Sequence, residues 1–131
     1  MPPAQRRFRV MIVEDEALIA MTVAQYVTSY GYEVVGPFGK VSQALSSLQE
    51  QPVDAAVLDV QLDREIVFPV AVELTARRIR FAFLTAHQPQ AFPEQFKRTD
   101  RVSKPFRQAE LKRALSKLIR NRPRAKSRKA D

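Results

Sequence analysis

Short apolar runs recur along the chain, and longer segments separate them. The run Ala55-Ala56-Val57-Leu58 contains no polar side chain and is shorter than an ordinary helix. Continuous apolar runs of this length are typical of strands that are covered on both faces, as the strands of a parallel sheet are. Strands are accordingly expected at residues 8–13, 32–36, 54–58, 80–84 and 101–103.

The separating segments have helical periodicity. Residues 16–30 are apolar around most of the helix circumference, which predicts deep packing, and Gly31 follows where a left-handed cap would end the helix. Residues 108–120 carry one apolar stripe, as an amphipathic helix does. Two prolines interrupt residues 88–97, so a short or irregular helix is expected there. The remaining helices are expected at residues 41–49 and 67–78.

This alternation of strands and helices predicts the fold. A strand that returns through a helix to a parallel neighbour makes a right-handed crossover, and helices then cover both faces of the sheet. Five such units predict a flavodoxin-like, doubly wound α/β domain with a five-stranded parallel sheet in the order 2-1-3-4-5. We expect this domain over residues 8–120, between a disordered lead (1–7) and a basic tail (121–131).

The positive charge is concentrated at the C-terminal end. The net charge is +8, and six basic residues from Arg120 onward face one acid, Asp131. This tail could contact nucleic-acid phosphates, but it offers no aromatic ring for base stacking, so a solvated tail is the favoured interpretation. The chain has no cysteine, no apolar run near the ~20 residues that cross a bilayer, and no apolar signal region. These features predict a cytoplasmic protein without membrane contact.

Reactive side chains follow four of the expected strands. Glu14 and Asp15 follow the first strand, Asp59 the third, Thr85 the fourth and Lys104 the fifth. Because the carboxyl ends of parallel strands meet at one edge, these groups should converge on Asp59. Such a set favours a metal-assisted, phosphoryl-accepting site. Taken singly, each residue also has an ordinary interpretation, such as an acid at a helix N-terminus, a turn residue or a solvated charge.

The four short motifs, in this order, resemble a response-regulator receiver domain. The resemblance covers about residues 8–120 and rests on Val13-Glu14-Asp15-Glu16, Leu58-Asp59, Leu84-Thr85-Ala86 and Ser103-Lys104-Pro105-Phe106. It implies that Asp59 accepts a phosphoryl group from a histidine kinase, a phosphotransfer protein or a small phosphodonor.

The resemblance also assigns roles around Asp59. It implies a Mg²⁺ ion held by Asp15, Asp59 and the backbone carbonyl of Gln61, with Glu14 acting through water. Lys104 would pair with the phosphoryl oxygens. Thr85 would hydrogen-bond the phosphoryl group and report its presence.

Three positions are interpreted separately. Gln61 and His87 lie two residues beyond Asp59 and Thr85, at the mouth of the family's site, where they would set the lifetime of the phosphorylated state. An ordinary surface histidine is the alternative for His87. Arg101 stands where the family often has an aromatic side chain that moves with the threonine, so the chain departs from that pattern.

The leading prediction is a single-domain phosphoacceptor switch rather than an enzyme that turns over external substrates. Its output partner would dock near the fourth helix, the fifth strand and the fifth helix. One alternative is a receiver that associates with nucleic acid through the basic tail. A Mg²⁺-dependent hydrolase is the other, although no cap insertion or substrate motif supports it.

Overall fold

The computed structural model describes residues 7–86 and 91–120, and their core is a five-stranded parallel sheet in the order β2-β1-β3-β6-β7. This order confirms the predicted doubly wound α/β fold. The two additional short strands pair with each other in an antiparallel hairpin. The strands are β1 (Arg9–Val13), β2 (Glu33–Phe38), β3 (Ala55–Asp59), β4 (Gln61–Leu62), β5 (Glu65–Ile66), β6 (Arg80–Thr85) and β7 (Arg101–Ser103).

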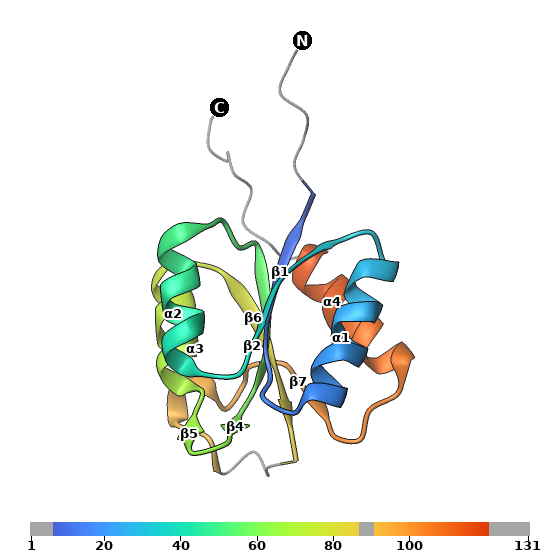
Figure 1. Cartoon of the computed structure of the whole chain (residues 1–131). Helices are drawn as coiled ribbons and strands as arrows, with labels where there is room; N and C mark the ends of the chain where they lie inside the picture. The colour runs from blue at the N-terminus through green and yellow to red at the C-terminus, as the bar shows by residue number, and fades with distance from the viewer. Residues whose placement is uncertain (1–6, 87–90, 121–131) are drawn as a thin grey trace.

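Helices cover both faces of the sheet (Figure 1). On one face lie α1 (Ala17–Ser29) and α4 (Gln108–Arg120), and on the other lie α2 (Val41–Glu50) and α3 (Phe68–Ala76). The central strand β3 is buried along its whole length, as a strand with two covered faces must be. No helix among residues 7–86 and 91–120 is long and apolar enough to span a bilayer.

An aromatic cluster fills the α2/α3 face. The ring of Phe83 is fully buried and lies 5.1–5.9 Å, centroid to centroid, from four other phenylalanine rings. These distances are typical of edge-to-face and tilted aromatic pairs, which add stability beyond the area that they bury. The four neighbours are Phe68, Phe81, Phe92 and Phe96.

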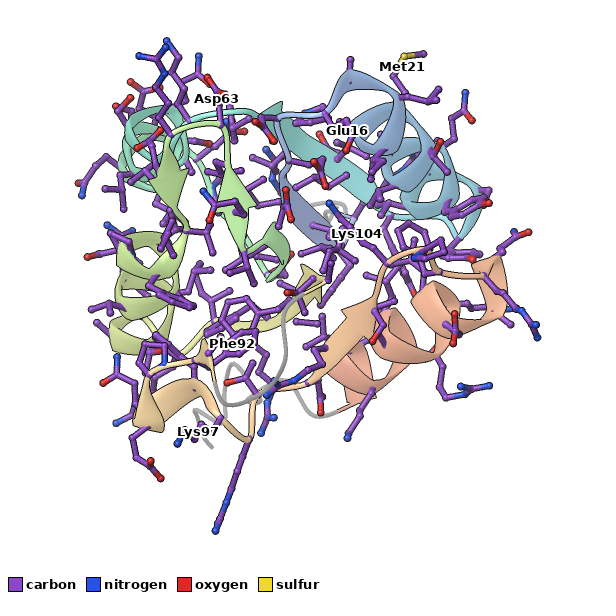
Figure 2. The ribbon with its side chains drawn as sticks, turned by 90° about the horizontal axis from the view of Figure 1, so that it is seen from below. Glu16, Met21, Asp63, Phe92, Lys97 and Lys104 are labelled. Atoms are coloured by element: carbon purple, nitrogen blue, oxygen red, sulfur yellow. The ribbon has the colours of Figure 1, made fainter. Side chains whose placement is uncertain are left out.

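The helix α1 is less deeply packed than its composition predicted. Leu18 is 75% exposed and Met21 is 59% exposed, and the Met21 side chain projects away from the sheet (Figure 2). The expectation that apolar residues around most of the circumference of 16–30 would be deeply packed was therefore wrong. Only one side of α1, with Ala20, Val23 and Val27, is buried.

Two helices end in the same hydrogen-bonded motif but with different residues. After α1, Gly31 adopts a left-handed φ of 91°, and its N–H donates to the Thr28 carbonyl while Tyr32 donates to Val27. After α3, Arg78 adopts a φ of 61° and donates to Thr75. Both are Schellman caps, and the second ends α3 earlier than the predicted residue 78 because Arg78 is left-handed.

The described residues between β6 and β7 hold little helix. The predicted short or irregular helix within residues 88–97 is represented by one 3-10 turn, Glu94–Phe96, and residues 87–90 lie outside the described part of the chain. The strand β2 also continues past the predicted residue 36. A Cβ atom on Gly36 (φ 102°) would lie 2.9 Å from the Ile12 carbonyl oxygen, so the close approach of β2 to β1 requires glycine.

Candidate functional site

The sheet register places the predicted reactive groups at one edge. Val13 of β1 is level with Leu58 of β3, and Asp59 is level with Leu84 of β6. Thr85 is level with Ser103 of β7, and the Thr85 carbonyl accepts a hydrogen bond of 3.0 Å from the Lys104 amide. The residues that follow these strands therefore face the same crevice at the carboxyl edge of the sheet.

A buried ion-pair cluster occupies this crevice. The Lys104 ammonium lies 3.0 Å from Oε1 of Glu14 and 3.1 Å from Oδ1 of Asp59. Both carboxylates are buried, with 3% exposure for Glu14 and 5% for Asp59. Figure 2 looks onto this edge, with Lys104 near the centre of the view. One ammonium thus contacts two buried carboxylates at once.

Burial changes the proton affinities of the cluster. Burial raises the pKa of Glu14 to about 7, and it also raises the pKa of Asp59. For Lys104, burial acts to lower the pKa, but the contacts with Glu14 and Asp59 outweigh it and raise the pKa. The lysine is therefore held in its charged form, while two carboxylates share its single positive charge.

The remaining negative charge fits a divalent cation. Glu14, Asp15 and Asp59 each offer a carboxylate oxygen within 4.8 Å of the others. Asp15 is exposed, so one side of the group is open to water. Mg²⁺ prefers oxygen ligands, retains several waters and uses one or two carboxylates, and this donor set suits it.

The other predicted site residues differ in their surroundings. Thr85 is 2% exposed at the end of β6. The Gln61 side chain bridges the β4–β5 hairpin, where its amide donates to the carbonyls of Leu62 at 2.9 Å and Glu65 at 3.2 Å. His87 lies outside the residues that the structure describes.

Arg101 anchors the turn before β7. Its guanidinium lies 4.3 Å from the ring centroid of Phe92 and donates to the carbonyls of Phe96 (3.4 Å), Lys97 and Thr99 (3.2 Å). The aromatic face and the three carbonyls, which all accept from Nη2, hold this cation in place, whereas Nη1 is buried without a hydrogen-bond partner. Arg101 therefore fastens the 3-10 turn to β7 at the position where the sequence departs from an aromatic residue.

Comparison with known families shows the family to which the chain belongs. Residues 10–116 match the family described as the response regulator receiver domain. The chain belongs to the response regulator receiver domain family. Members of this family are phosphoacceptors that typically use Mg²⁺.

Individual receiver proteins are similar over most of the chain. The solution structure of SdrG from Sphingomonas melonis Fr1 is 34% identical, with a TM-score of 0.76 over 86% of this chain and 97% of SdrG. The crystal structure of the response regulator PhyR from Brucella abortus is 33% identical, with a TM-score of 0.72 over 87% of this chain and 49% of PhyR.

A curated relative is longer. The transcriptional regulatory protein PdtaR of Mycobacterium tuberculosis is 37% identical over 71 residues, which are 54% of this chain and 35% of PdtaR. The aligned segment thus spans about a third of the length of that relative.

Proposed function

We propose that this receiver domain is a phosphoacceptor switch in a phosphorelay and that Asp59 carries the phosphoryl group. The observation that carries the proposal is the position of the Asp59 carboxylate, which is buried, 3.1 Å from the Lys104 ammonium and beside two further acids. A carboxylate is a competent nucleophile when nearby cations offset the charge that gathers during transfer. Two-component signalling in the cytoplasm is the proposed setting.

The transfer forms one bond and breaks one. An Asp59 carboxylate oxygen bonds to phosphorus, and the bond from phosphorus to the donor's histidine nitrogen or acyl oxygen breaks. Lys104 would hold the phosphoryl oxygens, and the Thr85 hydroxyl would hydrogen-bond them. When bound by Asp15, Asp59 and the Gln61 carbonyl, with Glu14 acting through water, Mg²⁺ would supply positive charge to the transferred group.

The test is phosphorylation by a small phosphodonor, followed by intact mass. Wild type is expected to gain one phosphoryl group only with Mg²⁺, and Asp59→Asn is expected to gain none. Because burial disfavours the charged form of Asp59, Asp59→Asn should unfold at a higher temperature than wild type. That result would show that the variant fails to gain a phosphoryl group for a reason other than unfolding. The exposed Asp63→Asn is the matched control. A full gain by Asp59→Asn would contradict the proposal.

The phosphodonor protein is proposed to dock on α1. Leu18 and Met21 are exposed on the helix that begins two residues after Asp15, so a partner that reaches the acidic site would cover them. Leu18→Ser with Met21→Ser should slow transfer from a phosphorylated histidine kinase by about tenfold, since apolar anchors commonly contribute more than ~1 kcal/mol. Transfer from a small phosphodonor should be unchanged. Equal slowing with both donors would place the two residues outside the docking surface.

Gln61 and His87 are proposed to set the lifetime of the phosphorylated state. The Gln61 side chain lies two residues beyond Asp59, although its amide is bonded within the hairpin. Replacing either residue with alanine is expected to change the dephosphorylation rate, measured as the decay of phosphorylated mass after the donor is removed. An unchanged decay in His87→Ala would remove His87 from this role.

The output partner is proposed to dock near the 3-10 turn Glu94–Phe96, β7 and α4, which stand where the sequence predicted the fourth helix, the fifth strand and the fifth helix. The related protein SdrG, which is 33% identical to this chain, has also been solved in a BeF3-activated conformation, and that structure superimposes on this chain with a TM-score of 0.74. An activated conformation in a similar protein supports a conformational response in this fold. The nucleic-acid alternative rests on residues 121–131, which lie outside the described part of the chain. No contact among the described residues favours it or the hydrolase alternative.

A further inference from the structure

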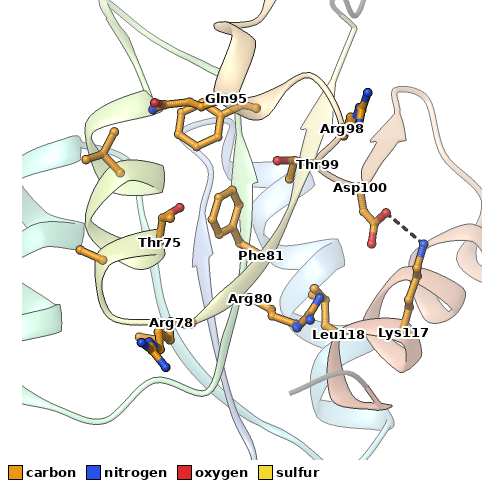
Figure 3. A pocket seen from close by; sticks show the side chains of 14 residues that line it. Thr75, Arg78, Arg80, Phe81, Gln95, Arg98, Thr99, Asp100, Lys117 and Leu118 are labelled. Atoms are coloured by element: carbon orange, nitrogen blue, oxygen red, sulfur yellow. Dashed lines mark hydrogen bonds and ion pairs between the residues drawn. The ribbon is translucent and has the colours of Figure 1, made fainter. Parts of the chain in front are cut away.

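A groove lies between α3 and α4, at the end of the sheet opposite the carboxylate cluster (Figure 3). Its volume is about 880 Å³. Since β7 pairs only with Phe83, Leu84 and Thr85, the outer edge of the first half of β6 has no strand beside it among the described residues. The 3-10 turn Glu94–Phe96 covers this edge only in part, and the groove is the space that remains.

Apolar side chains contribute to the groove wall. Val72 of α3 is 49% exposed, and Phe81 and Phe96 also line the groove. The Phe81 and Phe96 rings are 6.0 Å apart, centroid to centroid, and belong to the aromatic cluster beneath. A large apolar side chain entering here would contact the exposed Val72 and the half-buried Phe81, while Phe96 is almost fully buried, and such pockets accept anchoring residues of a partner.

Positive charge surrounds this apolar wall. Four cationic side chains line the groove, and one carboxylate, that of Asp100, accompanies them 3.1 Å from the Lys117 ammonium. Among residues 7–86 and 91–120, the other three cations form no ion pair. These three are Arg78, Arg80 and Arg98.

The backbone at Arg78 gives an independent indication. Arg78 holds a left-handed φ of 61° in the same kind of cap where α1 has Gly31. This conformation is unfavourable for a residue with a Cβ atom, and glycine would adopt it without that cost. A strained backbone that retains a long cation at the groove points to a role for the side chain.

We propose that this groove binds an acidic segment of a partner protein that carries apolar side chains. The charge is complementary to acids, and the aromatic wall suits apolar anchors. The termini of this chain are poor occupants, because residues 1–7 and 121–131 are both basic. A nucleic acid would match the positive charge, but it has no aliphatic side chain to fill the apolar part of the groove. Binding at this groove requires no phosphoryl group, so the inference does not depend on the proposed switch.

Three fluorescein-labelled synthetic peptides test the proposal by anisotropy. One combines Glu with Leu, one Lys with Leu at the same positions, and one Glu with Ser. Only the Glu/Leu peptide should bind, and its amide chemical-shift changes should map to the groove. Arg80→Glu with Arg98→Glu should weaken binding about tenfold or more, since like charges at an interface repel. Lys40→Glu with Arg64→Glu, two exposed cations elsewhere, should leave the affinity unchanged.

Arg78→Gly separates structure from binding. This variant should have a higher unfolding temperature, because glycine adopts the left-handed conformation at position 78 without strain. It should also bind the Glu/Leu peptide several-fold more weakly. A higher unfolding temperature with unchanged affinity would contradict the role of Arg78.

Three results would overturn the groove proposal as a whole. The first is that the Glu/Leu peptide shows no binding, and the second is that the Glu/Ser peptide binds equally well. The third result is that single-stranded DNA or a second copy of the chain binds in the groove instead. Asp59→Asn should bind the peptide normally, so failure of phosphorylation and failure of the groove are distinguishable.

Discussion

Lys104→Ala is expected to slow phosphorylation of Asp59 by about 100-fold, because removal of one preorganised charge from a site of this kind commonly costs a factor of ~10²–10³. The Lys104 ammonium contacts both Glu14 and Asp59, and these contacts raise its pKa and keep it charged. Without it, charge on the transferred group would meet two buried carboxylates that pair with no other cation among residues 7–86 and 91–120. The measurement is the rate of phosphoryl gain from a small phosphodonor at saturating Mg²⁺.

Two variants make this result specific. Lys104→Arg keeps the positive charge but replaces a compact ammonium with a planar fork, so its rate should fall between those of wild type and Lys104→Ala. Lys97→Ala removes an exposed lysine whose ammonium lies 3.2 Å from Glu94, and it should have the wild-type rate. A wild-type rate in Lys104→Ala would mean that this ammonium does not assist the transfer.

Phe83→Ala is expected to lower the free energy of unfolding by about 3–5 kcal/mol, the usual cost of truncating a buried phenylalanine. The ring is fully buried and contacts four other aromatic rings, so the surrounding side chains can fill the space only by losing their own contacts. Chemical denaturation monitored by circular dichroism measures the change. This loss is comparable to the whole stability of many small domains.

Because Phe83→Ala could leave little folded protein, Phe83→Leu provides a smaller step. It retains most of the apolar volume and should cost less than alanine while leaving a measurable transition. Ile66→Ala, at a side chain 48% exposed, is the surface control and should change the free energy by less than about 0.5 kcal/mol. A loss below ~1 kcal/mol in Phe83→Ala would show that the aromatic cluster repacks around the vacancy.

The architecture was predictable because its strands are continuous apolar runs. Burial on both faces leaves a plain signal in residues such as Ala55-Ala56-Val57-Leu58, and parallel pairing then brings the strand ends together. This is why Asp15, Asp59 and Lys104 could be expected at one edge before any coordinates. The order of the strands followed from the same alternation.

Other features depend on tertiary context and have no local signal. An apolar residue can face the core or the solvent, so composition alone did not distinguish the buried Val23 from the exposed Leu18. The β4–β5 hairpin has two residues in each strand, too few for periodicity. The groove depends on the short pairing of β7 and on the left-handed Arg78, which no glycine marks.

The short pairing of β7 also bears on the solubility of the protein. A strand edge with no neighbour can pair with the same edge of another molecule and begin aggregation, and natural proteins commonly guard such edges with charge. Arg80 stands at the open edge of β6, and Arg78 precedes it by two residues. Neutral substitutions at these arginines would therefore remove charge that opposes aggregation as well as a binding group. Charge-reversal variants keep a charged edge and are expected to aggregate less at high protein concentration.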